Sequence, residues 1–198
     1  SLGIGQGYNA FTVLQLANAT ATLANGGTSH QPHVGMYTTD VMTRERHPVP
    51  RAAPVDLGFK KANVDAVKRA MVGVTQGGTG TRVFAGARYV SGGKTGTAQA
   101  VTIGQKDKYN AKKLEEHQRD HALYIAFAPA DEPRIALAVI VENAGWGAGV
   151  AAPIARRVFD YWLNGDYPSV EDMAAVRKGQ ATAPIGTPRR AEDVPLLP

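Results

Sequence analysis

A helical repeat of apolar positions runs through residues 11–27. Apolar side chains recur there at intervals of three and four residues, which predicts a helix with one buried face. Thr12 is expected to cap its N-terminus, because Gln15 stands three residues later and completes a capping box. Gly26 or Gly27 is expected to end the helix, since glycine enters the left-handed backbone region without strain.

The same spacing predicts two further helices. Residues 63–75 carry apolar side chains on one face, and Asn63 is expected to be the N-cap. Residues 150–166 form a closing helix that Gly165 is expected to end. The aromatic pair Tyr161–Trp162 is interpreted as core packing of this last helix.

Strand patterns occupy other parts of the chain. Two β-rich runs, Leu123–Phe127 and Ile135–Val141, flank a turn that contains two prolines and Asp131, which predicts a β-hairpin. Residues 33–59 contain a short β-prone run and three prolines, which predicts a strand followed by an irregular connector. Helices followed by antiparallel strands and a closing helix predict an α+β fold, with helices packed on an antiparallel sheet.

The composition is that of a soluble globular protein, with 43% apolar and 20% charged residues. Residues 166–198 are rich in proline and small polar residues, so we expect a disordered tail there and a folded portion within residues 1–165. No apolar run approaches the roughly 20 residues of a membrane helix. The chain begins inside a glycine-rich loop without a methionine, so we interpret it as a piece of a longer protein.

Charge and cysteine content exclude several classes of site. The formal charge is +5, but the basic residues are spread among acidic ones, which indicates a mixed solvated surface and no nucleic-acid partner. The chain has no cysteine, which excludes disulfides, thiolate zinc sites and cysteine nucleophiles. His117 and His121 have the spacing of a helical zinc pair, but Gln118 replaces the catalytic glutamate of that motif. A salt-bridged turn is the favoured interpretation.

The candidate chemistry lies in residues 90–99, VSGGKTGTAQ. A phosphate-binding loop would need glycine where Arg88 stands, and a helix after Thr95, where the pattern is strand-like. Ser91 and Lys94 match the S-x-x-K spacing of a serine nucleophile, which requires a helical turn to bring the two side chains together. Two intervening glycines disfavour that turn, so Ser91 is interpreted as a chance match.

The third interpretation is a K-T-G-T strand at residues 94–97. Along a strand Lys94 and Gly96 point to one face, and Thr95 and Thr97 to the other. Gly96 lets the backbone of a substrate lie close to the strand. K-T-G is one of the motifs that β-lactamases and penicillin-binding proteins share, although the tripeptide alone is weak support.

Flanking segments make this interpretation specific. Residues 3–27, GIGQGYNAFTVLQLANATATLANGG, resemble the G-x-G-Q-G-Y-x-x-T-P-x-Q-x-A segment that precedes the K-T-G strand in class B penicillin-binding transpeptidases, with Val13 in place of the usual proline. Residues 109–145 are similar to the matching part of the elongation-type branch of that family, penicillin-binding protein 2. The resemblance covers residues 1–165. It implies part of the penicillin-binding-protein/β-lactamase-like transpeptidase fold.

The resemblance also implies a reaction without cofactor or metal. A serine attacks the D-Ala-D-Ala bond of a peptidoglycan stem peptide, and the acyl group passes to a neighbouring stem; β-lactams acylate the same serine. Lys94 is implied to assist proton transfer beside the catalytic serine. Thr95 and Thr97 are implied to hold the substrate carboxylate, with Gly96 allowing close approach, and the N–H of Thr97 to be an oxyanion-hole donor.

In that family S-x-x-K and S-x-N precede the glycine-rich segment at residue 3. The four serines of this chain include no S-x-N, and only Ser91 begins an S-x-x-K. We therefore expect the chain alone neither to cross-link stem peptides nor to form a covalent penicillin adduct. A non-catalytic penicillin- or peptidoglycan-binding module, or a penicillin sensor, is the alternative function.

The resemblance further implies a place in the cell and a set of partners. The longer protein is expected at the periplasmic face of the bacterial inner membrane, where membrane proteins of the elongation complex are its partners. Because the family's sheet has strands from outside this chain, we also expect self-association through an open sheet edge.

Overall fold

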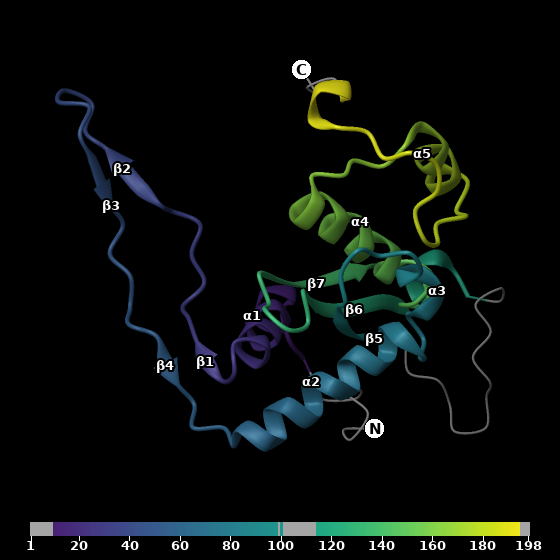
Figure 1. Cartoon of the computed structure of the whole chain (residues 1–198), viewed down its shortest axis with the longest axis horizontal. Coiled ribbons are helices and arrows are strands. Elements are labelled where there is room, and N and C mark those ends of the chain that lie inside the picture. Colours follow the sequence, from purple (N-terminus) through teal and green to yellow (C-terminus); the bar gives the residue numbers. More distant parts are fainter. Residues whose placement is uncertain (1–9, 99, 101–113, 195–198) are drawn as a thin grey trace.

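The computed structural model describes residues 10–98, 100 and 114–194 of the chain. The glycine-rich start of the family segment and most of residues 99–113 therefore lie outside the described residues. Helices cover a central antiparallel sheet, a thin ribbon of residues 37–48 projects from it, and the C-terminal segment with a further helix lies on the other side (Figure 1). The elements are α1 Val13–Ala24, β1 Thr28–Ser29, β2 Tyr37–Thr39, β3 Arg46–Pro48, β4 Val55–Asp56, α2 Lys61–Gln76, α3 Thr81–Phe84, β5 Gly92–Ala98, the 3₁₀ turn η3 Glu116–Gln118, β6 His121–Ala128, β7 Ile135–Val141, α4 Ala151–Asn164, α5 Val170–Arg177 and the 3₁₀ turn η4 Ala191–Asp193.

The sheet has the order β5-β6-β7, with both pairings antiparallel. Strands β6 and β7 form the hairpin that the two β-rich runs predict, and Ala128 pairs with Ile135 next to its turn. Strand β6 is the central strand. Ala122, Tyr124 and Ala126 are buried on one face, and on the other face Leu123 and Ile125 are partly buried. The α+β architecture predicted from the sequence is confirmed.

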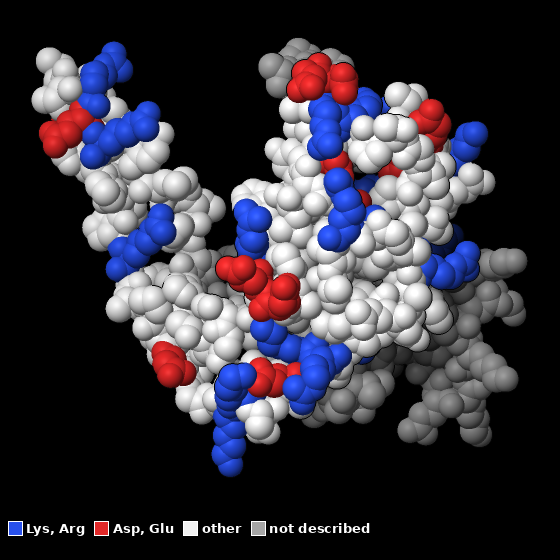
Figure 2. All heavy atoms as spheres, viewed as in Figure 1, with Lys and Arg blue, Asp and Glu red and all other residues white. Residues whose placement is uncertain are grey.

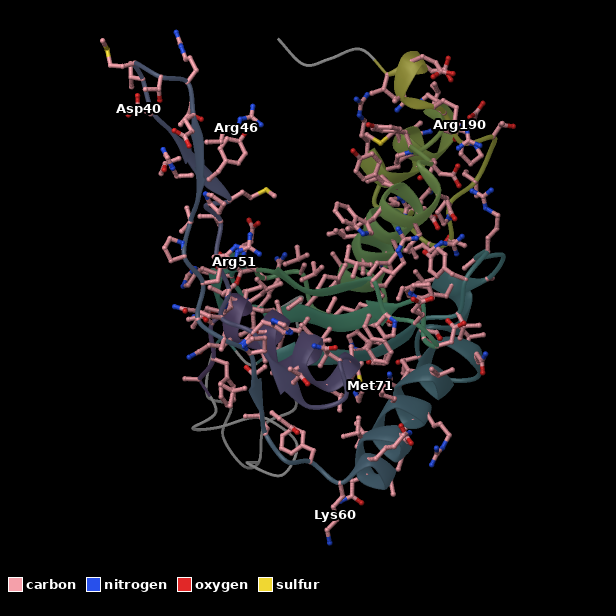
Figure 3. All side chains as sticks on the ribbon, turned by 60° about the vertical axis from the view of Figure 1, so that its left-hand side comes forward. Asp40, Arg46, Arg51, Lys60, Met71 and Arg190 are labelled. Carbon is pink, nitrogen blue, oxygen red and sulfur yellow. The ribbon has the colours of Figure 1, made fainter. Side chains whose placement is uncertain are left out.

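Two apolar clusters hold helices to opposite faces of this sheet. On one face, Tyr124 and the small residues around it pack against Phe159 of α4 and Phe84 of α3. On the other face, Phe127 packs against Ala24 of α1 and Met71 of α2. Met71 lies where α2 meets the sheet in Figure 3. The K-T-G segment, β5, is thus part of a sheet packed on both sides.

Helix α1 begins and ends as its sequence predicts. Thr12 accepts a hydrogen bond from the N–H of Gln15 at 3.1 Å, and the Gln15 side chain accepts one from the N–H of Thr12 at 2.9 Å. This reciprocal pair is the predicted capping box. The chain leaves the helix through Gly26, whose φ of 76° lies in the left-handed region.

Helix α2 starts earlier than predicted. Lys60 is the N-cap residue and makes no side-chain capping bond, whereas Asn63 lies inside the first turn. The expectation that Asn63 caps this helix is therefore wrong. Lys61 and Ala62 are good helix formers, and they extend the helix past the residue with the better capping side chain. Lys60 lies at the far end of α2 from the sheet (Figure 3).

Residues 33–59 contain more strand than predicted. Strands β2 and β3 pair in an exposed two-stranded ribbon, and β4 returns to pair with β1 near the end of α1. The ribbon projects from the body of the protein, with Asp40 at its tip and Arg46 on β3 (Figure 3). Arg46 stacks on the ring of Tyr37 at 4.5 Å from its centroid, a cation–π contact across the ribbon.

Helix α4 ends at Gly165, with a φ of 69°, as predicted. The expectation that Tyr161 and Trp162 fill the core is wrong, because their exposed fractions are 47% and 57%. Alanines at the start of α4, Phe159 and Asp160 form its buried face, and Tyr161 and Trp162 lie on the exposed side of the helix. The Tyr161 ring instead packs edge-on against Tyr167, with 4.9 Å between centroids.

Beyond α4 the structure differs from the expectation of a disordered tail. Helix α5 begins at Ser169, whose hydroxyl caps it by accepting from the N–H of Asp172 at 2.9 Å. Asp172 is 1% exposed and pairs with Arg157 of α4. Figure 3 shows Arg190 within this C-terminal segment, beside α4. The sequence near Asp172 does not indicate a partner for its charge, and in the fold Arg157 of α4 provides one.

Charged side chains are interspersed on the face shown in Figure 2, with acidic groups among the basic ones. This agrees with the mixed solvated surface predicted from composition. Among the described residues, none of the helices combines the length and apolar character that a membrane crossing requires.

Candidate active site

Strand β5, which carries the K-T-G motif, is an edge strand of the three-stranded sheet. Lys94 pairs with Ile125 and Thr95 with Tyr124, so each shares the face of its partner. Ile125 belongs to the cluster under α1, and Tyr124 to the cluster under α4. Lys94 therefore points to the α1 face and Thr95 to the α4 face, which is the alternation predicted from the sequence.

The two neighbouring motif residues continue this pattern. Gly96 pairs with Leu123 on the α1 face, and Thr97 pairs with Ala122 on the α4 face. Only β6 pairs with β5 among the described strands, so the far edge of β5 is free of strand pairing there. A peptide lying along that edge would meet backbone groups of β5 directly.

Lys94 is exposed, and its ammonium donates a hydrogen bond to the carbonyl oxygen of Thr95 at 2.6 Å. The Oγ1 of Thr95 lies 3.1 Å from the Oγ1 of Thr79, in the turn between α2 and α3. Sequence reasoning did not select Thr79. The run of glycines around it, GGTG, was the available signal, because glycines allow a backbone to pack closely.

The loop at residues 145–149 lies directly against the motif strand. A Cβ on Gly147 would collide with the carbonyl oxygen of Leu123 and come within 2.7 Å of that of Gly96. Only glycine therefore fits at this position between the loop and the sheet. Trp146 precedes it with 74% of its surface exposed.

Ser91 lies outside any helical turn. It is 2% exposed and directly precedes β5, so the backbone from Ser91 to Lys94 is not a helix. Its carbonyl oxygen accepts a hydrogen bond of 2.6 Å from the hydroxyl of Thr75 in α2. The interpretation of S-x-x-K as a chance match is confirmed, and the same strand geometry excludes a phosphate-binding loop.

A buried polar network holds the segment that leads into β5. Arg156 of α4 donates to both carboxylate oxygens of Asp160, at 3.0 and 2.8 Å, and to the carbonyl oxygens of Val83 and Ala85. The Tyr89 hydroxyl donates to Asp160 at 2.9 Å. Burial, and then the charge of Asp160, raise the pKa of Tyr89 well above its ordinary value, so it stays a hydrogen-bond donor.

The histidine pair does not form a zinc site. His117 lies in η3, where its Nδ1 is 3.5 Å from a carboxylate oxygen of Glu115, while His121 begins β6 and accepts from the N–H of Asn143. The two residues lie on different elements, so the helical spacing that such a site needs is absent. In the described part of the chain, no group of three or more histidine, aspartate or glutamate side chains could hold a metal ion.

Sequence comparison matches residues 1–160 to the family described as penicillin binding protein transpeptidase domain. The peptidoglycan D,D-transpeptidase MrdA of Haemophilus influenzae is 43% identical over 173 residues, which cover 86% of this chain and 26% of that protein. The MrdA of Acinetobacter baumannii is 46% identical over 165 residues, covering 82% of this chain and 24% of that protein. The chain thus spans about a quarter of the length of these curated relatives.

Solved structures give the same result for the fold. The crystal structure of Pseudomonas aeruginosa PBP2 in complex with WCK 5153 matches with a TM-score of 0.66 and 38% identity, over 86% of this chain and 35% of that one. PBP2 of Helicobacter pylori, solved in complex with MreC, matches with a TM-score of 0.61 and 25% identity, over 82% and 27% of the two chains. The expected partial transpeptidase fold is confirmed.

Proposed function

Because this chain belongs to the family of penicillin-binding protein transpeptidase domains, we propose that it supplies the K-T-G strand of an elongation-type peptidoglycan D,D-transpeptidase. The observation that carries this proposal is strand β5, which presents Lys94, Thr95, Gly96 and Thr97 at an edge free of strand pairing among the described residues. The family match ends near the end of α4. This match supports the proposal that residues 1–165 are the C-terminal portion of the transpeptidase domain and that residues 166–198 are a separate segment.

The reaction is serine acyl transfer between stem peptides. A serine outside this chain attacks the carbonyl of the penultimate D-Ala, the C–N bond breaks, and the terminal D-Ala leaves with a proton on its amine. The acyl group then passes to the amine of a neighbouring stem, and the serine regains its proton. Lys94 favours these proton transfers through the positive charge of its ammonium.

The other motif residues orient the substrate. The hydroxyls of Thr95 and Thr97 donate to the terminal carboxylate, and the N–H of Thr97 donates to the oxyanion that forms on the attacked carbonyl. Gly96 has no side chain, which lets the substrate backbone approach the strand edge. β-Lactams carry a carboxylate beside a strained amide, so the same groups would orient them.

The family and its relatives support a proposal for the partners. Stem peptides ending in D-Ala-D-Ala and β-lactams are the ligands, and the site is at the periplasmic face of the inner membrane. The Helicobacter pylori relative was solved in complex with MreC, which supports a protein of the elongation complex as a further partner. Ser91 is buried and the chain holds no S-x-N, so a non-catalytic penicillin- or peptidoglycan-binding module is the second candidate function.

Penicillin labelling separates the two candidates. The chain is fused to the upstream part of the Haemophilus influenzae relative, which restores the missing portion of the domain, and is incubated with a fluorescent penicillin. We expect a covalent adduct on the fusion that Lys94→Ala lowers severely, because the charge beside the nucleophile is lost. Lys61→Ala removes an exposed lysine of α2 and is the matched control.

The isolated chain is expected to show no adduct under the same conditions, with or without Ser91→Ala. A stoichiometric adduct on the isolated chain would falsify the assignment of the nucleophile to another part of the protein. Equal labelling of the Lys94→Ala and Lys61→Ala fusions would remove the proposed role of Lys94.

A further inference from the structure

The hydroxyl of Thr95 has one side-chain partner that the family motif does not include. Its Oγ1 lies 3.1 Å from the Oγ1 of Thr79, which is within hydrogen-bonding distance. Thr79 stands 16 residues earlier in the chain, between α2 and α3. The contact therefore joins the motif strand to a different part of the fold.

The turn that carries Thr79 has little freedom to move. A Cβ on Gly78 would lie 2.9 Å from the Cα of Val74, and one on Gly80 would lie 3.2 Å from the Val74 carbonyl oxygen. The N–H of Gly80 donates to that oxygen at 2.8 Å, and the hydroxyl of Thr81 donates to the carbonyl of Gly78 at 2.9 Å. The turn is thus packed onto the last turn of α2.

The same end of α2 is tied to the strand at a second point. The Thr75 hydroxyl donates to the carbonyl oxygen of Ser91 at 2.6 Å, and this bond is buried. Thr75 and Thr79 together fix α2 against Ser91 and Thr95. Thr79 is exposed, but the packed backbone of its turn and the buried bond from Thr75 to Ser91 hold it near Thr95.

The chemistry of the two hydroxyl groups indicates which threonine donates in this contact when an anion is bound. A hydroxyl has one proton to donate and can accept at its oxygen. If Thr95 gave its proton to Thr79, none would remain for a bound carboxylate. With Thr79 as donor, Thr95 accepts from it and donates onward, and each bond of such a chain polarises the next. An anionic ligand selects this second arrangement.

We propose that Thr79 is a positioning residue, which holds the Thr95 hydroxyl toward the carboxylate of an acyl-D-Ala-D-Ala ligand. The proposal deepens the proposed function and rests on it. A β-branched side chain has few stable χ1 rotamers, and its hydroxyl and methyl groups exchange places between them. The bond from Thr79 selects the rotamer in which oxygen, and not methyl, faces the ligand.

The test follows the Thr95 side chain by NMR in the full 198-residue chain. Three-bond couplings to its methyl carbon report χ1 without any ligand. We expect one rotamer in the wild type and in Thr79→Ser, which keeps the hydroxyl, and rotamer averaging in Thr79→Val. Thr81→Val is the matched control, because it removes a hydroxyl from the same turn that bonds Gly78 and not Thr95.

A titration then measures the affinity of each variant for a peptide ligand. N-acetyl-L-lysyl-D-alanyl-D-alanine should bind Thr79→Val roughly two- to tenfold more weakly than wild type, the range for one lost hydrogen bond. Thr79→Ser should restore the affinity, and the C-terminal amide of the peptide should show no such difference. A merely structural role of Thr79 would weaken both ligands equally.

Each outcome decides one of the two proposals. If the wild type binds the peptide but Thr79→Val changes neither the Thr95 couplings nor the affinity, the positioning role is wrong and the proposed function stands. If the carboxylate peptide leaves the Thr95 signals of the wild type unmoved, the carboxylate site on β5 is wrong, and the role of Thr79 is lost with it.

Discussion

Arg157 of α4 donates two hydrogen bonds to the carboxylate of Asp172 in α5, with nitrogen–oxygen distances of 2.8 and 2.6 Å. The Arg157 guanidinium also donates to the carbonyl oxygens of Pro153 and Thr182, so three segments meet at one side chain. The Asp172 side chain is 1% exposed, and apart from a 3.4 Å hydrogen bond from the N–H of Ile185 its carboxylate is bound by this arginine. The C-terminal segment is therefore attached to the domain by a buried ion pair.

Arg157→Ala is expected to release that segment. Removing one partner of a buried ion pair leaves an uncompensated charge and costs about 3–5 kcal/mol. None of the described residues 166–194 belongs to the two apolar clusters on the sheet, so we expect amide hydrogen exchange to rise in α5 while β6 stays protected. Lys61→Ala, which removes the exposed Lys61–Asp65 pair, is the control and should change neither. Unchanged exchange in α5 would contradict the attachment.

Alkaline pH is expected to destabilise the fold through two tyrosines. Burial raises the pKa of Tyr124, and burial followed by the charge of Asp160 raises that of Tyr89, relative to the ordinary value of 10.0. Above about pH 10 the unfolded chain loses these protons while the folded chain keeps them, so stability is complete below that pH and falls as pH rises. Urea unfolding at roughly equal steps between pH 8 and pH 11 measures how steeply the free energy of unfolding falls with pH.

Phenylalanine variants distinguish the two rings. Tyr89→Phe loses a hydrogen bond to a carboxylate and should lower the free energy of unfolding at pH 7 by about 1–3 kcal/mol. Within the described residues the Tyr124 hydroxyl has no hydrogen-bond partner, so Tyr124→Phe should change stability at pH 7 by less than about 1 kcal/mol. Both should flatten the alkaline slope, and a slope that neither variant alters would contradict the burial of these phenols.

Gly147→Ala is expected to push the loop of residues 145–149 away from β5. The added methyl would meet backbone atoms of Leu123 and Gly96, which cannot rotate aside, and overpacking of this kind costs about 1–3 kcal/mol. Thermal unfolding and the amide signal of Gly96 would report the change. Gly149→Ala is the control, since its methyl would meet only the carbonyl oxygen of Trp146, at 3.7 Å. Equal effects of the two variants would argue against the close contact.

Self-association through a sheet edge remains a prediction. In the described part of the chain no strand lies beyond β7, whose outer backbone groups can pair with a second copy. Light scattering should show mass increasing with concentration, and Ile140→Lys should oppose it, because a charge on an edge strand disfavours pairing. Ile140 is 37% exposed, so the lysine reaches solvent without entering the core. A monodisperse monomer at every concentration would overturn the prediction.

Local signals predicted the elements whose causes are local. The capping box of Thr12 and Gln15 and the glycine end of α4 each depend on neighbours within a few residues, and both are confirmed. The β6–β7 hairpin needed only alternation and a turn. The motif strand was also predicted, because two glycines before Lys94 made a helical turn improbable and β-prone residues followed it.

What sequence did not reveal depends on contacts between distant residues. Nothing near Asp172 announces Arg157 as its partner, so composition alone suggested disorder for a segment that is folded. The contact of Thr79 could not be predicted for the same reason, because only the folded turn brings its hydroxyl to Thr95. Helical spacing also cannot say which face α4 buries, and for this reason Tyr161 was misplaced.

The hydrogen bonds from Arg156 to the carbonyls of Val83 and Ala85 have a consequence for biosynthesis. Residues before the motif strand are secured by a helix that is translated more than 50 residues after it. A ribosome releases the chain from its N-terminus onward. The strand with Lys94 therefore emerges long before the helix that fixes its approach, and the edge of β5 cannot reach its final geometry until α4 has emerged as well.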